Sequence, residues 1–189
     1  MKKFFLLLMA AATFNANAAL ISITTDKDTY NVGETITATV RASELSESGA
    51  QTYFFGYDIA VFFDSLFVSF DPTTVTDLGA IGVPLFGPLN YSSANSASLS
   101  SATFGPVEPF QAGKTEVDIF SFVLVALSSG TVDLSFAKAE LSNNIGFNLL
   151  LEAPRGTSFE IAQVPAPGTF ALSLLALGGM FFARKHAKS

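Results

Sequence analysis

Carboxylates are the main side chains in this sequence that could carry out acid–base chemistry. There are sixteen Asp and Glu residues but no Cys, and the single His, His186, lies in a basic C-terminal tail. A thiol nucleophile, a thiolate metal site, and a Ser-His-Asp triad or His-ligated metal in the body of the chain are therefore excluded. A glycosidase would need two carboxyl groups roughly 5–9 Å apart in a cleft. By elimination, the candidates for such a pair are Asp58, Asp64, Glu108, Glu116, Asp118 and Glu140.

The alternative for these carboxylates is a solvated position on a strand face or in a turn. Asp64 and Asp71 each stand beside an expected turn, where a carboxylate commonly accepts hydrogen bonds from the local backbone. We favour this alternative, and we predict no catalytic residue and no enzymatic activity.

A calcium site is the one cofactor hypothesis that the sequence offers. Asp26 and Asp28 place two carboxylates in one loop, and hard oxygen ligands suit Ca²⁺. The sequence contains no EF-hand loop pattern, and a plain polar loop is the alternative. We predict no other metal or cofactor.

A carbohydrate site on a sheet face would need exposed aromatic rings. The sequence has no Trp, and its aromatic side chains with a polar tip are Tyr30, Tyr53, Tyr57 and Tyr91. Phe55 and Phe62 alternate away from the face of Tyr57 and could form an exposed patch. Packing of both against a second sheet or a covering loop is the alternative.

The charges are unevenly distributed along the chain. All sixteen acidic residues lie between Asp26 and Glu160, whereas five of the ten basic residues lie at the two ends. Residues 19–163 therefore carry sixteen acidic and five basic side chains, a net charge of −11. Such an acidic body repels phosphate backbones, so we exclude nucleic-acid binding.

The body, residues 19–163, shows the alternating pattern of β-strands. Ile36, Ala38, Val40 and Ala42 share one face of a strand over 35–42, and the segment 53–63 is the most apolar strand. We expect further strands over 20–24, 66–70, 90–94, 98–104, 117–127, 131–136, 147–153 and 157–164, with a polar loop over 43–52. The strand over 117–127 is expected to contain a bulge near Ile119 and Phe120, because its apolar alternation slips there.

Many short strands joined by turns predict an all-β fold, a two-sheet sandwich of jelly-roll type. A closed barrel is the alternative. With 145 residues the body can bury a core without disulfides, and we expect most of the twenty Phe residues to fill it.

The N-terminal residues 1–18 have the features of a secretory signal peptide. Lys2 and Lys3 precede a short apolar run, and Ala16 and Ala18 give the small-x-small cleavage pattern. We predict cleavage after Ala18, so that the mature chain begins at Ala19. An uncleaved anchor is the alternative.

Residues 164–189 combine a short motif, an uncharged run over 169–183, and a basic end. The fifteen-residue run would extend about 22 Å as a helix, short against a hydrocarbon core of about 30 Å unless its flanks snorkel or the bilayer thins. We predict a single transmembrane helix, with the body outside and the stop residues Arg184, Lys185 and Lys188 in the cytoplasm. A buried amphipathic helix is the alternative, but the run has no polar stripe.

This C-terminal arrangement resembles the PEP-CTERM sorting signal of Gram-negative bacteria. The motif here is Val164-Pro165-Ala166-Pro167, with Ala166 in place of the usual Glu. The resemblance implies an anchored precursor in the inner, cytoplasmic membrane, cut near Val164 and Pro165 by an exosortase protease. The body would then reach the cell surface or the extracellular matrix.

The body itself resembles cohesin modules. The resemblance rests on Tyr30-Asn31-Val32-Gly33-Glu34 before an alternating strand, on residues 57–64 before 66–70, and on residues 130–136. It implies a jelly-roll sandwich of about nine strands. It does not imply dockerin binding, because no residues of this sequence match dockerin-recognition residues. We therefore expect an exported, non-enzymatic surface or matrix protein, with association with exopolysaccharide as a family-level expectation. The alternative is a cohesin-like module that binds a protein partner or a polysaccharide through a sheet face or the 71–112 loops.

Overall fold

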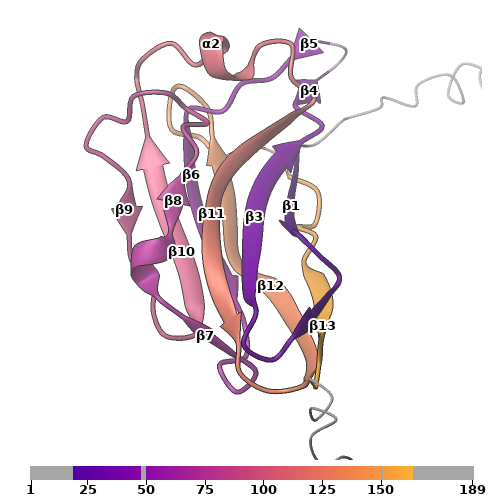
Figure 1. The fold of residues 1–189 in the computed structure, drawn as a ribbon. Coiled ribbons are helices and arrows are strands. Elements are labelled where there is room, and N and C mark those ends of the chain that lie inside the picture. The colour runs from indigo at the N-terminus through magenta and orange to yellow at the C-terminus, as the bar shows by residue number, and fades with distance from the viewer. Residues whose placement is uncertain (1–18, 48–49, 150, 164–189) are drawn as a thin grey trace, which may run out of the picture.

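The computed structural model describes residues 19–47, 50–149 and 151–163, which form two packed β-sheets (Figure 1). The strands are β1 (Leu20–Thr25), β2 (Thr29–Asn31), β3 (Thr35–Ser43), β4 (Ser46–Glu47), β5 (Ala50–Gln51), β6 (Gly56–Phe62), β7 (Val68–Phe70), β8 (Thr76–Asp77), β9 (Leu89–Asn90), β10 (Ser96–Ala102), β11 (Glu116–Ala126), β12 (Gly130–Ser142) and β13 (Thr157–Ala162). Helix in this part of the chain is limited to a 3₁₀ turn, η1 (Pro72–Thr74), and one short α-helix, α2 (Glu108–Gln111).

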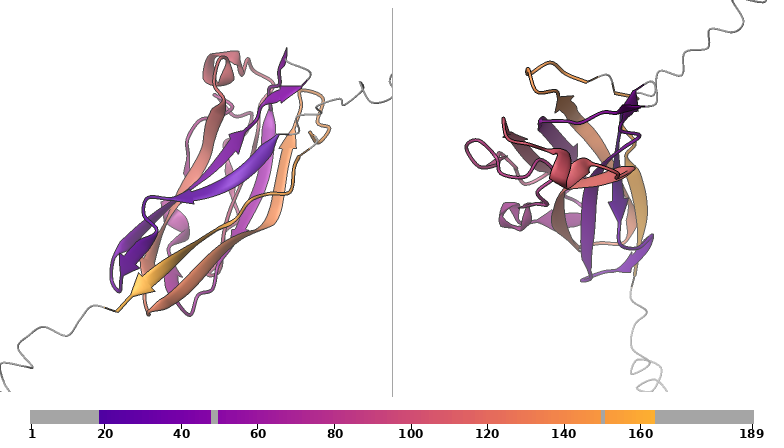
Figure 2. Two further views of the ribbon diagram at one scale, coloured as in Figure 1. Left: turned by 90° about the vertical axis from the view of Figure 1, so that its right-hand side faces the viewer. Right: turned by 90° about the horizontal axis from the view of Figure 1, so that it is seen from above.

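The strands divide between a five-stranded and a six-stranded sheet. The five-stranded sheet has the order β1-β3-β11-β7, with β8 also pairing with β11, and the six-stranded sheet has the order β2-β13-β12-β6-β10-β9. Strands β4 and β5 form a separate hairpin. The two sheets lie face to face along their length (Figure 2), which confirms the predicted all-β sandwich rather than a closed barrel.

The N-terminal strands join the two sheets at one side of the sandwich. Strand β1 pairs with β3 in the five-stranded sheet, and after the corner at 26–28 strand β2 pairs in parallel with β13 in the other. The segment before β13 runs alongside β1: Ile23 N–H donates to the Arg155 carbonyl (3.1 Å), and Arg155 N–H donates to the Ile21 carbonyl (2.9 Å). These contacts close the sandwich on that side.

The core contains the side chains that the period-two pattern predicted. On β3 the buried set is Ile36, Ala38, Val40 and Ala42, and on and just after β6 it is Tyr57, Ile59, Val61 and Phe63. Phenyl rings fill the space between the sheets, with ring centroids of Phe63 and Phe70 5.3 Å apart and those of Phe63 and Phe122 6.1 Å apart.

The predicted bulge in β11 is confirmed. The register of β11 against β3 shifts between Asp118 and Phe120, so Ile119 is the extra residue. The bulge lets Phe120 pair with Val40, and both Ile119 and Phe120 are fully buried.

Several element predictions were wrong in their extent. The expected polar loop over 43–52 contains the β4–β5 hairpin, and the strand expected over 131–136 extends to Ser142. The segment 147–153 pairs only through isolated bridges, such as Ser142 with Asn148 and Ala19 with Leu151. Short pairings like these depend on neighbours distant in sequence, which local alternation does not reveal.

The expectation that most Phe residues fill the core holds only in part. Among the described residues, Phe54, Phe63, Phe120, Phe122 and Phe159 are buried. The exposed ones are Phe62, Phe86, Phe104, Phe110 and Phe147, and four of these lie in loops or in α2 rather than in a sheet. These five phenyl rings therefore expose apolar area to solvent.

The two terminal predictions concern residues outside the described part of the chain. Ala16, Ala18, the motif Val164–Pro167 and the basic stop belong to this group, whereas Ala19 is described and buried. Within residues 19–47, 50–149 and 151–163, no helix is long and apolar enough to cross a membrane. The run 169–183 lies outside the described residues.

Candidate functional site

The outer face of the six-stranded sheet gathers side chains from strands that are far apart in sequence. Glu140 on β12 pairs with Asp58 on β6, Asp58 pairs with Ser100 on β10, and Ser100 pairs with Leu89 on β9. Paired residues in an antiparallel sheet point to the same side. These four side chains therefore form one row across the outer face.

A charged cluster occupies the middle of this face. Lys138 Nζ lies 2.6 Å from Asp58 Oδ2 and 3.4 Å from Glu140 Oε2. The Tyr91 hydroxyl donates a hydrogen bond to Asp58 Oδ1, so Asp58 binds both a cation and a phenol. Partial burial together with the Asp58 carboxylate raises the pKa of Tyr91, and the hydrogen bond to Asp58 raises the pKa of Lys138. Tyr91 remains a neutral donor and Lys138 a cation at neutral pH.

A bulge in β12 aims Lys138 at this cluster. The register of β12 against β6 shifts between Phe136 and Lys138, so Ala137 is the extra residue and Lys138 lies opposite Ala60. In a regular strand the residue after the inward Phe136 would take the outward place, and Lys138 would point toward the core. The bulge thus turns a lysine outward between two carboxylates.

Apolar side chains flank the charged cluster. Leu89 is 66% exposed, Tyr91 is 49% exposed, and Phe62, which pairs with Ser96 and Ser135, is 45% exposed. A central polar network next to exposed aromatic and aliphatic groups has the composition of a protein recognition surface. We call this set, Phe62, Leu89, Tyr91, Asp58, Lys138 and Glu140, the sheet surface.

The outer face of the five-stranded sheet differs in chemistry. Thr24, Thr39, Ser121 and Thr76 form a row of hydroxyl side chains across four strands. Charge is concentrated at one end of the face, where Arg41 lies 2.6 Å from both Glu116 and Asp118. Large apolar side chains with the exposure of Leu89 do not stand in this row, so the sheet surface is the better candidate for recognition.

The structure places the six candidate carboxylates in three kinds of position. Asp58 and Glu140 share Lys138, and Glu116 and Asp118 share Arg41. Asp64 Oδ1 accepts from Leu66 N–H at 2.9 Å, as expected for a turn, and Glu108 lies in the first turn of α2. Asp71 likewise accepts from Thr73 N–H at 2.9 Å. These arrangements are typical of surface ion pairs and turns rather than of a catalytic pair.

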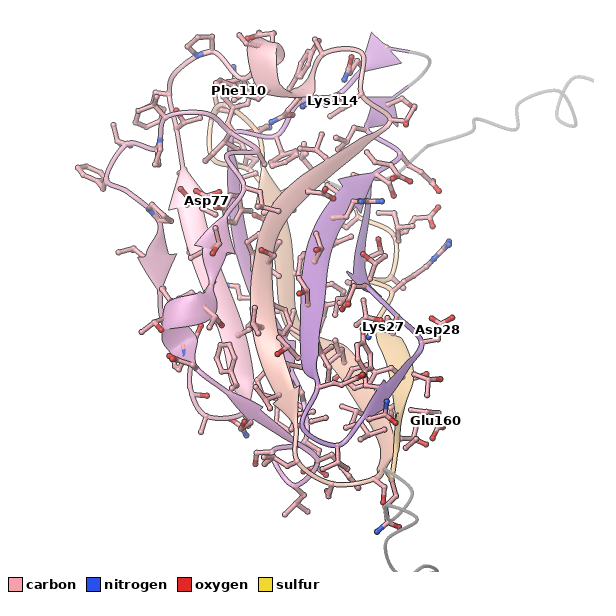
Figure 3. The ribbon with its side chains drawn as sticks, in the orientation of Figure 1. Lys27, Asp28, Asp77, Phe110, Lys114 and Glu160 are labelled. Carbon is pink, nitrogen blue, oxygen red and sulfur yellow. The ribbon has the colours of Figure 1, made fainter. Side chains whose placement is uncertain are left out.

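The calcium candidates lie at the corner between β1 and β2. Asp26 Oδ1 accepts hydrogen bonds from the Tyr30 hydroxyl and from Thr37 N–H, both at 2.8 Å, and Asp28 stands beside Lys27 at the same corner (Figure 3). Burial alone would raise the pKa of Asp26, but these two hydrogen bonds leave it below its ordinary value. Within the described residues no three His, Cys, Asp or Glu side chains group as a metal site. Calcium binding by Asp26 and Asp28 stays a prediction.

The aromatic side chains considered for carbohydrate stacking differ in exposure. Tyr30 and Tyr57 are buried, and Phe55 is partly buried against the core. Tyr91 and Phe62 are exposed and belong to the sheet surface. The outward position of Phe62 agrees with the predicted alternation. The location of Tyr91 could not be read from periodicity, because residues 91–93 cross over β10, where Ser92 exchanges hydrogen bonds with Ser98.

Comparison with known proteins gives the fold of the chain. No model of a known protein family matches it, and no curated protein matches its sequence. A cohesin module from a family 33 glycoside hydrolase of Clostridium perfringens aligns with a TM-score of 0.55 at 14% identity, over 78% of this chain and 99% of the module. A non-cellulosomal cohesin from the archaeon Archaeoglobus fulgidus gives 0.55 at 11% identity, over 77% and 91%.

A third similar structure includes a binding partner. A type II cohesin of Acetivibrio cellulolyticus, solved in a cohesin–X-dockerin complex, aligns with a TM-score of 0.55 at 16% identity, over 76% of this chain and 99% of that one. At identities this low the likeness concerns the fold. The chain therefore has a cohesin-like β-sandwich fold.

Proposed function

We propose that this chain is a non-catalytic binding module that recognises a protein partner through its sheet surface. The observation that carries the proposal is the Tyr91–Asp58–Lys138–Glu140 network, built from β6, β12 and the segment after β9 and flanked by exposed Leu89 and Phe62. The partner in the cohesin–X-dockerin complex makes protein recognition a reasonable role for this fold.

The charge of the surface indicates the chemistry of the partner. Asp58 and Glu140 outnumber Lys138, and Asp133 and Glu160 extend the acidic character along β12 and β13. A partner with basic side chains around an apolar anchor would complement this face. Because exposed charges are screened by salt, binding should weaken as ionic strength rises.

Site-specific crosslinking in the native host would test the proposal. A photoreactive residue would replace Ser100, which lies between Asp58 and Leu89 on the outer face of the six-stranded sheet. The matched control would carry it in place of Thr39, in the hydroxyl row of the opposite face. We expect one discrete crosslinked protein from position 100 and none from position 39. In the same background, Asp58→Lys should reduce the crosslink at least tenfold, because it places two like charges together.

Two results would overturn the proposal. Equal crosslinking from positions 100 and 39 would mean that the sheet surface is not selective. Crosslinking at position 100 to polysaccharide alone would mean that the partner is a glycan rather than a protein.

The route to the cell surface belongs to the same proposal. The signal pattern ending at Ala16 and Ala18 would export the chain, and the motif Val164–Pro167 with the run 169–183 would hold it in the membrane until an exosortase releases it. Intact mass of the protein from membrane and extracellular fractions tests this step. A species from Ala19 to about Val164 is expected, and a species that keeps residues 170–189 would refute release.

A further inference from the structure

A second group of exposed apolar side chains lies in the loops near α2, away from the charged cluster. Val83, Phe86 and Phe104 are 83%, 88% and 80% exposed. Leu78, Leu85 and Phe110 are exposed to lesser degrees. We call these six residues the loop patch; Phe110, which belongs to α2, is labelled in Figure 3.

Backbone contacts hold the members of the loop patch together. Leu85 N–H donates to the Ala102 carbonyl, and the Thr103 hydroxyl donates to the Val83 carbonyl, each at 2.8 Å. These bonds place Val83 and Leu85 beside the segment that leads to Phe104. The Phe110 ring covers Gly82 so closely that a β-carbon there would collide with it. The segments that carry Val83, Leu85, Phe104 and Phe110 therefore lie next to one another.

The loops that carry the patch are anchored from inside. Ala80, Ile81 and Val107 are buried, and the side chain of Gln111, also fully buried, donates to the Ala80 carbonyl at 3.1 Å. The loops thus have their own core contacts. The exposed side chains of Val83, Phe86 and Phe104 do not contribute to that core.

Five of the six patch residues, all except Phe110, lie in one long uncharged segment of the body. Residues 78–107 include no Asp, Glu, Lys or Arg, whereas residues 19–163 carry a net charge of −11. Two copies of so acidic a body repel each other over most of their surface. An uncharged apolar patch is complementary to itself, which is what a twofold interface between identical chains requires.

The area of the patch suits such an interface. If a phenylalanine offers about 200 Å², the exposed fractions of Phe86 and Phe104 leave roughly 340 Å² in water. That already reaches the size of the largest apolar patch on a typical monomer, about 300–600 Å². The other four members extend it toward the roughly 800 Å² that each partner contributes to a standard interface.

We infer that the loop patch is the surface through which two copies of this chain associate about a twofold axis. A lipid surface would meet the same side chains, but anionic headgroups repel the acidic body, including Asp77 and Glu108 at the borders of the uncharged segment. Association driven by apolar contact between two acidic bodies should strengthen as salt screens their repulsion. Partner binding by the sheet surface should show the opposite salt dependence.

The absence of Cys from the sequence allows a direct test on the full chain. A Phe86→Cys variant would be treated with a short bismaleimide crosslinker, and Leu66→Cys would be the control. Leu66 is 75% exposed and lies in the turn that follows β6, at the end of that strand away from Ala102. We expect a crosslinked dimer from Phe86→Cys that increases with salt, and only background from Leu66→Cys.

A second substitution shows whether the patch itself drives the contact. Adding Phe104→Ser to the Phe86→Cys chain should reduce the dimer at least fivefold without changing the unfolding midpoint, because Phe104 is 80% exposed. Equal crosslinking of Phe86→Cys and Leu66→Cys would overturn the inference. So would a Phe86→Cys dimer insensitive to Phe104→Ser, or capture of the chain by vesicles containing anionic lipid that Phe104→Ser abolishes. None of these outcomes depends on the sheet surface.

Discussion

Gln111 offers the sharpest test of how this fold positions its loops. Its side chain is fully buried and every polar atom of it is used. Oε1 accepts from Phe54 N–H at 3.1 Å, and Nε2 donates to the Phe54 carbonyl at 2.8 Å and to the Ala80 carbonyl at 3.1 Å. One glutamine at the end of α2 thus joins the segment before β6 to the loop after β8.

The Gln111→Leu substitution keeps the approximate volume but removes these three hydrogen bonds. Each buried backbone group left without a partner costs about 1–3 kcal/mol. Burial of the more apolar leucine side chain stabilises the folded chain by about 1–2 kcal/mol. The expected net loss is about 3 kcal/mol in the free energy of unfolding.

Urea unfolding followed by far-UV circular dichroism would measure this loss. With a urea dependence of about 2 kcal/mol per molar, the midpoint should fall by roughly 1.5 M. Gln51→Leu is the matched control: Gln51 bonds the same loop, with Nε2 2.6 Å from the Gln111 carbonyl, but it is only partly buried. It should cost less than about 1 kcal/mol because water can replace its contacts. A Gln111→Leu midpoint equal to that of Gln51→Leu would refute the reasoning.

Four further predictions concern other parts of the sandwich. Tyr30→Phe should lower the free energy of unfolding by about 1–3 kcal/mol, because the Tyr30 hydroxyl bonds Asp26 and Lys27 N–H. Tyr57→Phe should be neutral or stabilising in the same urea unfolding assay, since the buried Tyr57 hydroxyl has no hydrogen-bond partner within the described residues. The pKa of Asp26 is lowered in the folded chain, so its contribution to stability is present above its ordinary value of 3.8 and is lost as the pH falls through the folded pKa. Asp26→Asn should therefore make the free energy of unfolding fall less steeply between pH 5 and pH 2, although other carboxylates still contribute to the fall. An unchanged pH dependence would contradict the lowered pKa of Asp26. Gly156→Ala should destabilise by about 1–3 kcal/mol, because its β-carbon would collide with the Leu134 carbonyl, whereas Gly33→Ala meets no atom within 4 Å and bears only the strain of φ +89°.

Local alternation was enough to predict which side chains of the regular strands face the core. The buried sets on β3 and β6 follow from period two alone, since one face of each strand is apolar. The β11 bulge could also be predicted, because two consecutive apolar residues, Ile119 and Phe120, break the alternation at that point. In these segments, local sequence and tertiary structure agree.

The sheet surface could not be predicted in the same way. Asp58 and Lys138 are eighty residues apart and meet only because β12 pairs with β6 in one particular register. The β12 bulge shifts the inward positions from Phe136 to Ala139 and Leu141, and it lies beyond the strand predicted over 131–136. Gln111 was missed for a related reason: a single polar residue in a loop gives no periodic signal of its burial.

The two proposed surfaces are close enough to act together. Leu89 of the sheet surface and Phe86 of the loop patch are three residues apart, at the β9 edge of the six-stranded sheet. Asp58 and Lys138 lie on β6 and β12, with β10 between them and that edge. A dimer formed through the loop patch would therefore carry two charged clusters, neither of which belongs to the proposed interface. Two linked sites bind a repetitive partner more tightly than either site alone, without any new contact. On this reasoning, Phe104→Ser should weaken binding to a multivalent partner far more than binding to a monovalent one, a difference that loss of the sheet surface would not produce.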